Sequence, residues 1–442
     1  MKNVCKKWMK TCWLFGFVFA CLFAVCSCST EADGDVVLLP DTNRLIAFKL
    51  YPNDMAKNDS AAANFARGIK LVVHPGASYQ LSFDVDSTQP APELQLFRTY
   101  NLNDGTGRVR FARVRALSPT VVGNRYVYQF NCEENKMANW YTSLNVDGQY
   151  YEGRVENIRF TGVGSYSNHF SINLIVVGAM QPTEDGLLID ELATQMLARF
   201  REKYYGAVID TLYVRFAENH PTLGSKYPAN LPWVAGYNSE DVFVSELVDW
   251  PEEELRNTLP IVLVNSIDDD EIMGLSHLFS GSMMGEDKGA VVVGEFVNSK
   301  TFGTTQLLTS NNIIMTAIHE TGHFFGLRHT STTVRDLDQE VKKTDGTVAM
   351  IGDWSNIEDG LTDTPFCEFI LRNDLFSKQT ETRKRRSDIV YRSSEEYIKA
   401  NLNACQDKNN IMFPVTVDER YVVSFSQQQM ELIQQSLSII PH

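Results

Sequence analysis

Three histidines and a glutamate lie within the run HETGHFFGLRHT, which begins at His319. In a helix, residues four positions apart share a face, so His319 and His323 can direct their imidazole rings to one point, with Glu320 beside them. Gly326 can end the helix in a backbone conformation that strains other residues, which lets His329 return as a third nitrogen ligand. Three nitrogens around a tetrahedral zinc ion leave one position open for water, so the run predicts a catalytic zinc site.

A zinc site with an open position predicts hydrolytic chemistry. The metal lowers the pKa of its bound water to about 7, and a neighbouring carboxylate can take the water proton during attack on a carbonyl. Glu320 is the candidate general base. The alternative is a buried amphipathic helix with incidental histidines, but five fixed positions in a chain with only 8 histidines make coincidence a poor explanation.

The segments around this run predict an α/β domain that positions it. Apolar residues at helical spacing follow the capping-type pair Asn311 and Asn312, which favours a helix leading into His319. The form S-x-x-Q at Ser426–Gln429 predicts the start of a last helix that reaches about Leu437. Further periodic or apolar segments predict a helix over 190–205 and strands over 209–216, 259–264 and 289–297, the first two of them buried.

These residues resemble a known family. HETGHFFGLRHT is similar to the zinc motif of the metzincin metallopeptidases, in which a methionine turn lies beneath the metal. Asn409–Pro414 is the candidate turn, with Met412 as its methionine. The nearest likeness is to the pappalysin-like (cytophagalysin) group and related bacterial lipoproteins. It is carried by Thr330, the segment DGLTDTP at 359–365, Cys367 and Cys405.

The resemblance covers about residues 190–442 and implies a zinc endopeptidase that acts on protein or peptide substrates. In metzincins the strand before the zinc helix is the edge strand along which the substrate lies, which here implies Gly289–Val297. One position departs from the family pattern. Pro414 stands two residues after Met412, where several metzincins, pappalysin-like ones included, have a tyrosine. The oxyanion stabiliser and the substrate-binding residues are therefore not assigned.

Residues 1–28 have the form of a bacterial lipoprotein signal peptide. Four lysines precede the apolar stretch Trp13–Val25, which is too short for a comfortable membrane span. The segment VCSC that ends at Cys28 resembles a lipobox, and Cys28 fits the lipidated position better than Cys26 because the small Ser27 precedes it. The alternative is a leader that is merely rich in cysteine.

Lipidation of Cys28 implies that the leader is removed and that acyl chains anchor the protein to a membrane. Residues 29–44 then form an acidic tether, and acidic residues at its start resemble a surface-export signal of lipoproteins in some Gram-negative bacteria. An ordinary solvated tether explains the same residues equally well. We expect a bacterial outer membrane lipoprotein on the cell surface, with the periplasmic face as the alternative.

Cysteine usage agrees with export. Five of the 8 cysteines lie in the leader, which leaves Cys132, Cys367 and Cys405. Cys367 and Cys405 flank a long polar insertion, so a disulfide between them would close that loop and hold the methionine turn in an oxidising compartment. Cys132 then remains unpaired. No latency motif surrounds it, which favours a plain half-buried cysteine over one that caps the zinc.

Charge argues against a nucleic-acid partner. The formal net charge is −15, and it falls to about −19 once the four leader lysines are removed. A chain this acidic repels a phosphate backbone. The basic run Arg383–Arg386 lies in the insertion between Cys367 and Cys405, where an exposed loop that proteases can nick is the simplest explanation.

Residues 45–179 predict an all-β domain, a sandwich, followed by a linker over 180–188. Short alternating or apolar runs separated by turn residues occur at Tyr79–Val85, Tyr126–Phe130 and Phe170–Val177. Pro75–Phe83 and Val155–Phe160 resemble strands of galactose-binding-like jelly-roll modules, which implies a glycan as a candidate ligand. Packing is the favoured role of the aromatic residues that would form a sugar platform, Tyr100, Trp140, Tyr141, Tyr150 and Tyr151.

The expected architecture is therefore multidomain, with an N-terminal all-β sandwich and a C-terminal α/β metzincin domain over 190–442. Its expected function is zinc-dependent cleavage of extracellular proteins. The alternative is a glycan-binding or adhesin surface lipoprotein with an inactive metzincin domain, and the intact Glu320 favours the enzyme. Calcium is a further candidate ligand at Asp268–Glu271 and at Asp359 with Asp363, although neither has a full loop spacing, which favours solvated acidic loops.

Overall fold

The computed structural model describes residues 51–52, 66–67, 70–85, 90–101, 109–135, 138–147, 149–150, 155–235, 244–267, 272–276, 283, 288–299, 303–331, 359, 361–367, 402–414 and 422–442. All of them belong to one compact unit, Val36–His442. The predicted signal peptide, the lipidation site Cys28, the acidic tether 29–44, the basic run Arg383–Arg386 and the acidic run Asp268–Glu271 lie outside the described residues.

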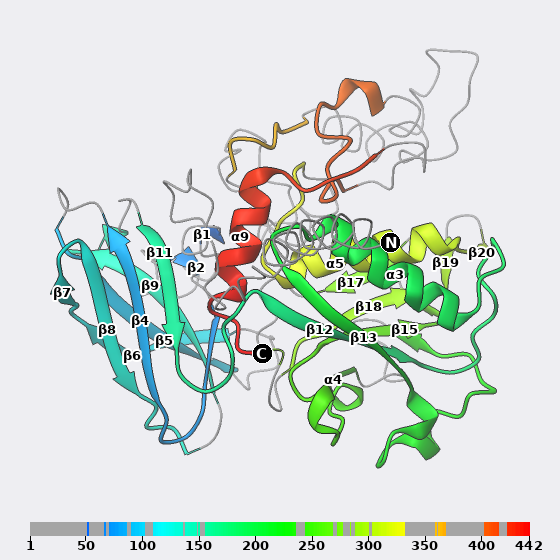
Figure 1. The fold of residues 1–442 in the computed structure, drawn as a ribbon, viewed down its shortest axis with the longest axis horizontal. Helices are drawn as coiled ribbons and strands as arrows, with labels where there is room; N and C mark the ends of the chain where they lie inside the picture. Colours follow the sequence, from blue (N-terminus) through cyan, green and yellow to red (C-terminus); the bar gives the residue numbers. More distant parts are fainter. Residues whose placement is uncertain are drawn as a thin grey trace, which may run out of the picture. The chain divides into compact units, whose positions relative to one another are not determined.

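The N-terminal part of the described chain consists of antiparallel sheets (Figure 1). One sheet has five strands, β10 (Gln149–Tyr150), β9 (Ala138–Val146), β5 (Glu93–Asn101) and β6 (Val109–Leu117), with β3 (Lys70–Val73) paired to β9. The other has four strands, β11 (Val155–Thr161), β4 (Ser78–Val85), β8 (Arg125–Asn131) and β7 (Thr120–Val122). A separate pair joins β1 (Tyr51–Pro52) to β2 (Ala66–Arg67). The strands predicted at Tyr79–Val85 and Tyr126–Phe130 are confirmed as β4 and β8.

Alternating burial explains how these two sheets pack. Along β8, Tyr126, Tyr128 and Phe130 are buried, whereas Gln129 between them is exposed, as expected for a strand with one face on a core. Phe130 of the four-stranded sheet contacts Trp140 of the five-stranded sheet, with ring centroids 5.9 Å apart. The two sheets therefore share one core, which also holds the free thiol of Cys132.

Of the aromatic residues considered as a sugar platform, Trp140 has a described side chain. Trp140 is buried in the core between the sheets, which is the packing role that the sequence favoured. The backbones of Tyr100, Tyr141 and Tyr150 belong to β5, β9 and β10, and Tyr151 lies outside the described residues.

The C-terminal part is built on a five-stranded mixed sheet. Its order is β13 (Val208–Phe216), β12 (His169–Val176), β15 (Leu259–Val264), β18 (Val291–Gly294) and β17 (Gly274–Ser276). The first four strands are parallel, and β17 runs antiparallel to β18. The helices α3 (Ile189–Lys203) and α5 (Ser310–Phe324) cover one face, and α4 (Val244–Leu247) lies on the other (Figure 1).

Strand β12 corrects the predicted domain boundary. The segment Phe170–Val177 was expected in the β-sandwich, but it pairs with β13 and β15 in the mixed sheet. Its Leu174 packs on the α5 side and its Ile175 on the α4 side, so both faces of the strand are buried. A nearly continuous apolar run is what a parallel strand covered on both faces requires. The segment 180–188 accordingly connects β12 to α3, inside this part of the chain.

The edge of the mixed sheet also differs from expectation. The segment Gly289–Val297 was expected as the edge strand, but β18 lies between β15 and β17, and the chain then continues into β19 (Phe296–Ser299). Strand β19 forms a hairpin with β20 (Thr304–Leu307). The strand at the edge is the three-residue β17, which is too short to leave a periodic signal in the sequence. At the opposite edge, β13 is mostly half-buried instead of fully buried as predicted.

The remaining elements are short, apart from the last helix. The capping box predicted at Ser426 is present, and α9 (Gln427–Leu437) follows it and packs Met430, Ile433 and Leu437 into the core beside α5. The 3₁₀ turns are η2 (Ala217–Asn219), η3 (Gly224–Lys226), η4 (Glu253–Leu255) and η6 (Leu402–Ala404), and β14 (Val234–Ala235) pairs with β16 (Ser266–Ile267). Within the described ranges, no helix combines the length and the apolar character needed to cross a bilayer.

Candidate metal centre

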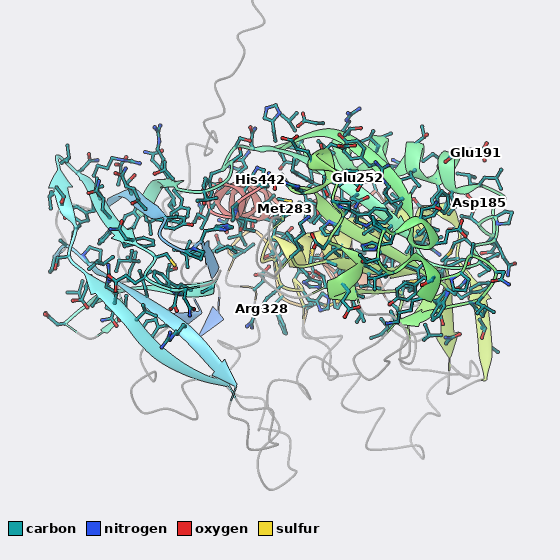
Figure 2. All side chains as sticks on the ribbon, turned by 90° about the horizontal axis from the view of Figure 1, so that it is seen from below. Asp185, Glu191, Glu252, Met283, Arg328 and His442 are labelled. Carbon is teal, nitrogen blue, oxygen red and sulfur yellow. A yellow bond between two sulfur atoms is a disulfide. The ribbon has the colours of Figure 1, made fainter. Side chains whose placement is uncertain are left out.

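Helix α5 carries the first part of the run HETGHFFGLRHT, and its first turn is fixed by two caps. The expected capping pair, Asn311 and Asn312, lies within the first turn of the helix. The N-cap is Thr309, whose side chain accepts a hydrogen bond from Asn312 N at 3.2 Å. Asp185, labelled in Figure 2, adds a carboxylate that accepts from Ser310 N at 2.7 Å and from Ser310 Oγ at 2.6 Å. A negative charge here also complements the helix dipole.

The hydrogen bonds at Asp185 change its acidity. Partial burial raises the pKa of its carboxyl, but hydrogen bonds from Ser310 and Thr183 outweigh that effect and lower the pKa to about 2. The carboxylate therefore stays charged at the end of the helix throughout the neutral and mildly acidic range.

Gly326 ends the helix as the sequence predicted. Its φ is +96°, in the region where a side chain would be strained. Gly326 N donates to His323 O at 2.9 Å, and Leu327 N donates to Gly322 O at 2.9 Å. These bonds satisfy carbonyls at the end of α5 while the chain reverses. The reversal brings His329 back beside the helix.

The structure brings His319, His323 and His329 together. The Nε2 atom of His329 lies 3.1 Å from Nε2 of His319 and 3.2 Å from Nε2 of His323. Metal-ligand atoms of all three residues lie within 4.8 Å of one another. Tetrahedral zinc with nitrogen ligands at about 2.0–2.1 Å requires nitrogens spaced on this scale, so the donor set fits zinc.

Two backbone carbonyls determine which ring nitrogens face the centre. Nδ1 of His319 lies 2.7 Å from Ile411 O, and Nδ1 of His323 lies 2.7 Å from Leu327 O. A carbonyl oxygen can only accept, so each Nδ1 must carry the proton, which leaves the lone pair on Nε2. Both rings are thereby held in the tautomer that a metal ligand needs.

Glu320 lies beside this cluster and is 8% exposed. Burial raises the pKa of its carboxyl to about 8, and the nearby His329 opposes part of that rise. The backbone of Gly274, in β17, passes close to this side chain: a Cβ built on Gly274 would lie 2.6 Å from Cγ and 3.0 Å from Oε1 of Glu320.

The predicted methionine turn lies directly beneath α5. Met412 is fully buried, and a Cβ on Gly322 would lie 2.5 Å from its sulfur, so the turn touches the helix between two of the histidines. Asn410 shapes the turn, with Oδ1 accepting from Met412 N at 2.8 Å and its carbonyl accepting from Phe413 N at 3.1 Å. Thr330 N donates to Met412 O at 3.0 Å, which ties the turn to the residue after His329.

The expected disulfide between Cys367 and Cys405 is present, with Cα atoms 5.2 Å apart. It lies next to the chain that follows His329, because Cys367 N donates to Ser331 Oγ at 2.8 Å. Ser331 in turn donates to Asp407 at 2.5 Å. The sulfurs and the Asp407 carboxylate are close enough to suggest a second metal group, but the sulfurs are already bonded to each other.

Asp359 and Asp363, considered above as calcium ligands, have protein donors. Asp359 is buried and accepts from Thr364 Oγ1 and from Leu361 N. Burial, with repulsion from Asp363 and Asp407, raises the pKa of Asp359 to about 7. The Asp363 carboxylate accepts from the first turn of α9 instead, through Ser426 Oγ and Gln428 N at 2.9 Å each.

Sequence reasoning missed three residues that shape this centre. Asp185 was placed in a linker, Gly274 in no element, and Asp407 was not noticed. Asp185 and Gly274 lie far along the chain from the helix they contact, so no local pattern marks them. Asp407 stands only five residues before Met412, and its acidic side chain in a cysteine-flanked segment is the one signal that was available.

Comparisons with known proteins give low similarity. No family model matches the chain, and a search of the curated proteins finds no match. Among solved structures, metalloproteinase-II from Bacteroides fragilis is 12% identical over 51% of this chain and 79% of that chain, with a TM-score of 0.24.

Two further structures score lower. The M60 catalytic domain of ZmpC from Clostridium perfringens, in complex with the sialyl T antigen, is 12% identical over 64% of this chain and 52% of that chain, with a TM-score of 0.15. An acetyl xylan esterase from the rumen bacterium Butyrivibrio proteoclasticus is 13% identical over 57% and 67%, with a TM-score of 0.13. These scores do not define a shared fold, so the function of the chain is argued from its own residues.

Proposed function

We propose that this protein is a zinc-dependent endopeptidase of the metzincin type that cleaves extracellular protein substrates. One observation carries the proposal. The Nε2 atoms of three histidines converge while backbone carbonyls hold the Nδ1 protons of two of them, and a buried carboxylate lies beside the cluster. This combination matches the needs of a hydrolytic zinc site and has no ordinary role in a core.

His319, His323 and His329 would hold the ion, which when bound supplies a Lewis acid for the substrate carbonyl and for water. Glu320 provides the proton transfers. Its carboxylate takes the proton of the attacking water and passes it to the departing amide nitrogen. Walls formed by β17 and α5 keep this side chain away from bulk solvent, which strengthens its interaction with developing charge.

Strand β17 is the candidate docking edge for the substrate. Gly294 N donates to Met273 O at 2.8 Å, so the neighbouring pair, Gly274 opposite Val293, is a non-hydrogen-bonded pair of the ladder. The N–H and C=O groups of Gly274 therefore point away from β18. Among the described residues no strand pairs with this side of β17, which leaves it for an extended peptide.

The test uses the substitution Glu320→Gln, which keeps the shape of the side chain but cannot accept a proton. We expect the variant to retain zinc and to lose about 10²–10⁴-fold in turnover of casein. Wild-type protein treated with a chelator should lose activity and regain it with added zinc. Casein cleavage at the wild-type rate by Glu320→Gln would place the base elsewhere. Absence of zinc-dependent cleavage in the wild type would favour the adhesin alternative.

We also propose that the protein is anchored to the outer membrane through acyl chains on Cys28. The support is the leader and lipobox pattern, in which a small residue precedes Cys28. Cys28→Ala should move the protein from the membrane fraction to the soluble fraction. Radiolabelled palmitate incorporated into the Cys28→Ala variant would contradict the assignment.

A further inference from the structure

We propose that Gly274 is a positioning residue for Glu320. The missing side chain at this place in β17 lets the general-base carboxylate lie directly against the strand that would bind the substrate. This inference rests on the proposed endopeptidase function and names a residue that determines where its base stands.

The side-chain position of Gly274 points at α5. A Cβ there would lie 2.5 Å from Thr316 Cγ2 and 2.6 Å from Glu320 Cγ, distances that real Cβ atoms do not show. The next residue, Leu275, packs on the opposite face of the sheet, as the alternation of a strand requires. The space that a side chain would fill is therefore the space that Glu320 and Thr316 occupy.

Backbone conformation does not explain the glycine. Several glycines of this chain have positive φ, Gly326 among them, but Gly274 is not one of them. Alanine can therefore adopt its backbone angles without strain. Glycine is required at this position because a side chain would occupy the space of Thr316 and Glu320.

The same residue also faces the expected substrate. Its N–H and C=O groups point to the free side of β17, while its Cα lies against the Glu320 side chain. One residue thus connects the backbone that would hold an extended peptide to the carboxylate that would accept the proton. Since Glu320 is buried and Thr316 Cγ2 is equally close, an added methyl group must move these two side chains or the strand. A misplacement of about 1 Å in a catalytic group can cost about 10²-fold in rate.

The first experiment measures Gly274→Ala in the full, zinc-loaded chain. We expect zinc content to be unchanged and kcat on casein-derived fluorogenic peptides to fall by about 10²-fold, with KM within about twofold of wild type. The matched control is Gly206→Ala, outside β17 and α5, where an added Cβ would also be crowded, 2.3 Å from Gln434 Nε2 and 3.1 Å from Met430 Cε. It should lower thermal stability and leave kcat within about threefold.

The second experiment combines each substitution with Glu320→Gln. If Gly274 acts through the base, Gly274→Ala should change the residual rate of Glu320→Gln by less than about twofold, because the group it positions no longer transfers protons. An equal loss of rate in both backgrounds would overturn the inference, as would wild-type kcat in Gly274→Ala itself.

A stability cycle tests the steric part without using activity. Glu320→Gln keeps the Cγ atom, so the loss of Tm caused by Gly274→Ala should persist in it. Glu320→Ala removes Cγ, so in that background the loss should shrink to the part caused by Thr316 Cγ2, which would lie 2.5 Å from the added Cβ. A Gly274→Ala protein that fails to fold alone should recover part of its folded population in that background. An unchanged loss of Tm in the Glu320→Ala background would refute the contact. Because this cycle measures Tm and not activity, it tests the contact between Gly274 and Glu320 even if the wild type proves inactive. Failure of the inference and failure of the proposed function are therefore distinguishable.

Discussion

The Cys367–Cys405 disulfide should support the proposed zinc site more directly than it supports the rest of the fold. The bridged residues are 38 positions apart, and closing a loop of this length stabilises the native state by about 4 kcal/mol in the chain-entropy model. The perturbation is the double substitution Cys367→Ser and Cys405→Ser.

The contacts around the bridge indicate which segment loses stability when the disulfide is removed. Ser331 accepts from Cys367 N and donates to Asp407, which follows Cys405 by two positions. Asp407 also accepts from Thr330 Oγ1 at 2.7 Å, immediately after His329. Without the bridge, the chain on both sides of these contacts gains freedom, so the third histidine loses part of its support. Loss of such supporting contacts typically weakens metal binding by about 10–100-fold.

The assay compares zinc affinity, by competition with a chelator, and hydrogen exchange of residues 402–414. The control is Cys132→Ser, which removes the free buried thiol of the β-sandwich. We expect the double variant to bind zinc at least about tenfold more weakly and the control to bind it normally. Unchanged zinc affinity together with a lower unfolding midpoint would show that the bridge stabilises the fold in general. A bridge from Cys132 to either partner in a non-reducing peptide map would contradict the pairing.

Two further predictions concern α5, the helix that carries two of the three proposed zinc ligands. His323→Ala should lower bound zinc from about one equivalent to nearly none and abolish peptidase activity with it, measured by elemental analysis and casein cleavage, because two imidazoles do not hold a tetrahedral site. Asp185→Ala should cost roughly 1 kcal/mol of stability at neutral pH, as for other helix caps. The folded pKa of Asp185 is lowered to about 2 from an unfolded value near 4. In urea unfolding of wild type and variant, this difference should therefore be constant above about pH 5, decline as the pH falls between about 5 and 2, and vanish only below about pH 2.

The residues that act through local geometry could be predicted from the sequence. The three histidines, Glu320 and Gly326 lie in one helix and the turn after it, so spacing alone determines their relation. The capping box at Ser426 is local in the same way.

Features that depend on distant pairing could not be predicted. Strand β12 was assigned to the wrong sheet because an apolar run reports burial and not the identity of its neighbours. Strand β17 has only three residues, too few to show hydrophobic periodicity in the sequence. It nevertheless forms the sheet edge and brings Gly274 against Glu320. Asp185 caps α5 through contacts between residues 125 positions apart in the chain, and a Thr-Glu-Asp-Gly segment is indistinguishable from a linker until those contacts are seen.

The carbonyls of Ile411 and Leu327 that hold the histidine tautomers have a consequence for evolution. Their oxygens belong to the backbone, so replacing either side chain by another apolar residue leaves both hydrogen bonds in place. The three histidines cannot change in this way, because the nitrogens that converge at the centre belong to their side chains. Mutational drift should therefore be tolerated in the support of the site and not in its ligands. Related chains would then keep the same three histidines while the residues that orient them vary, provided that the path of the chain is kept.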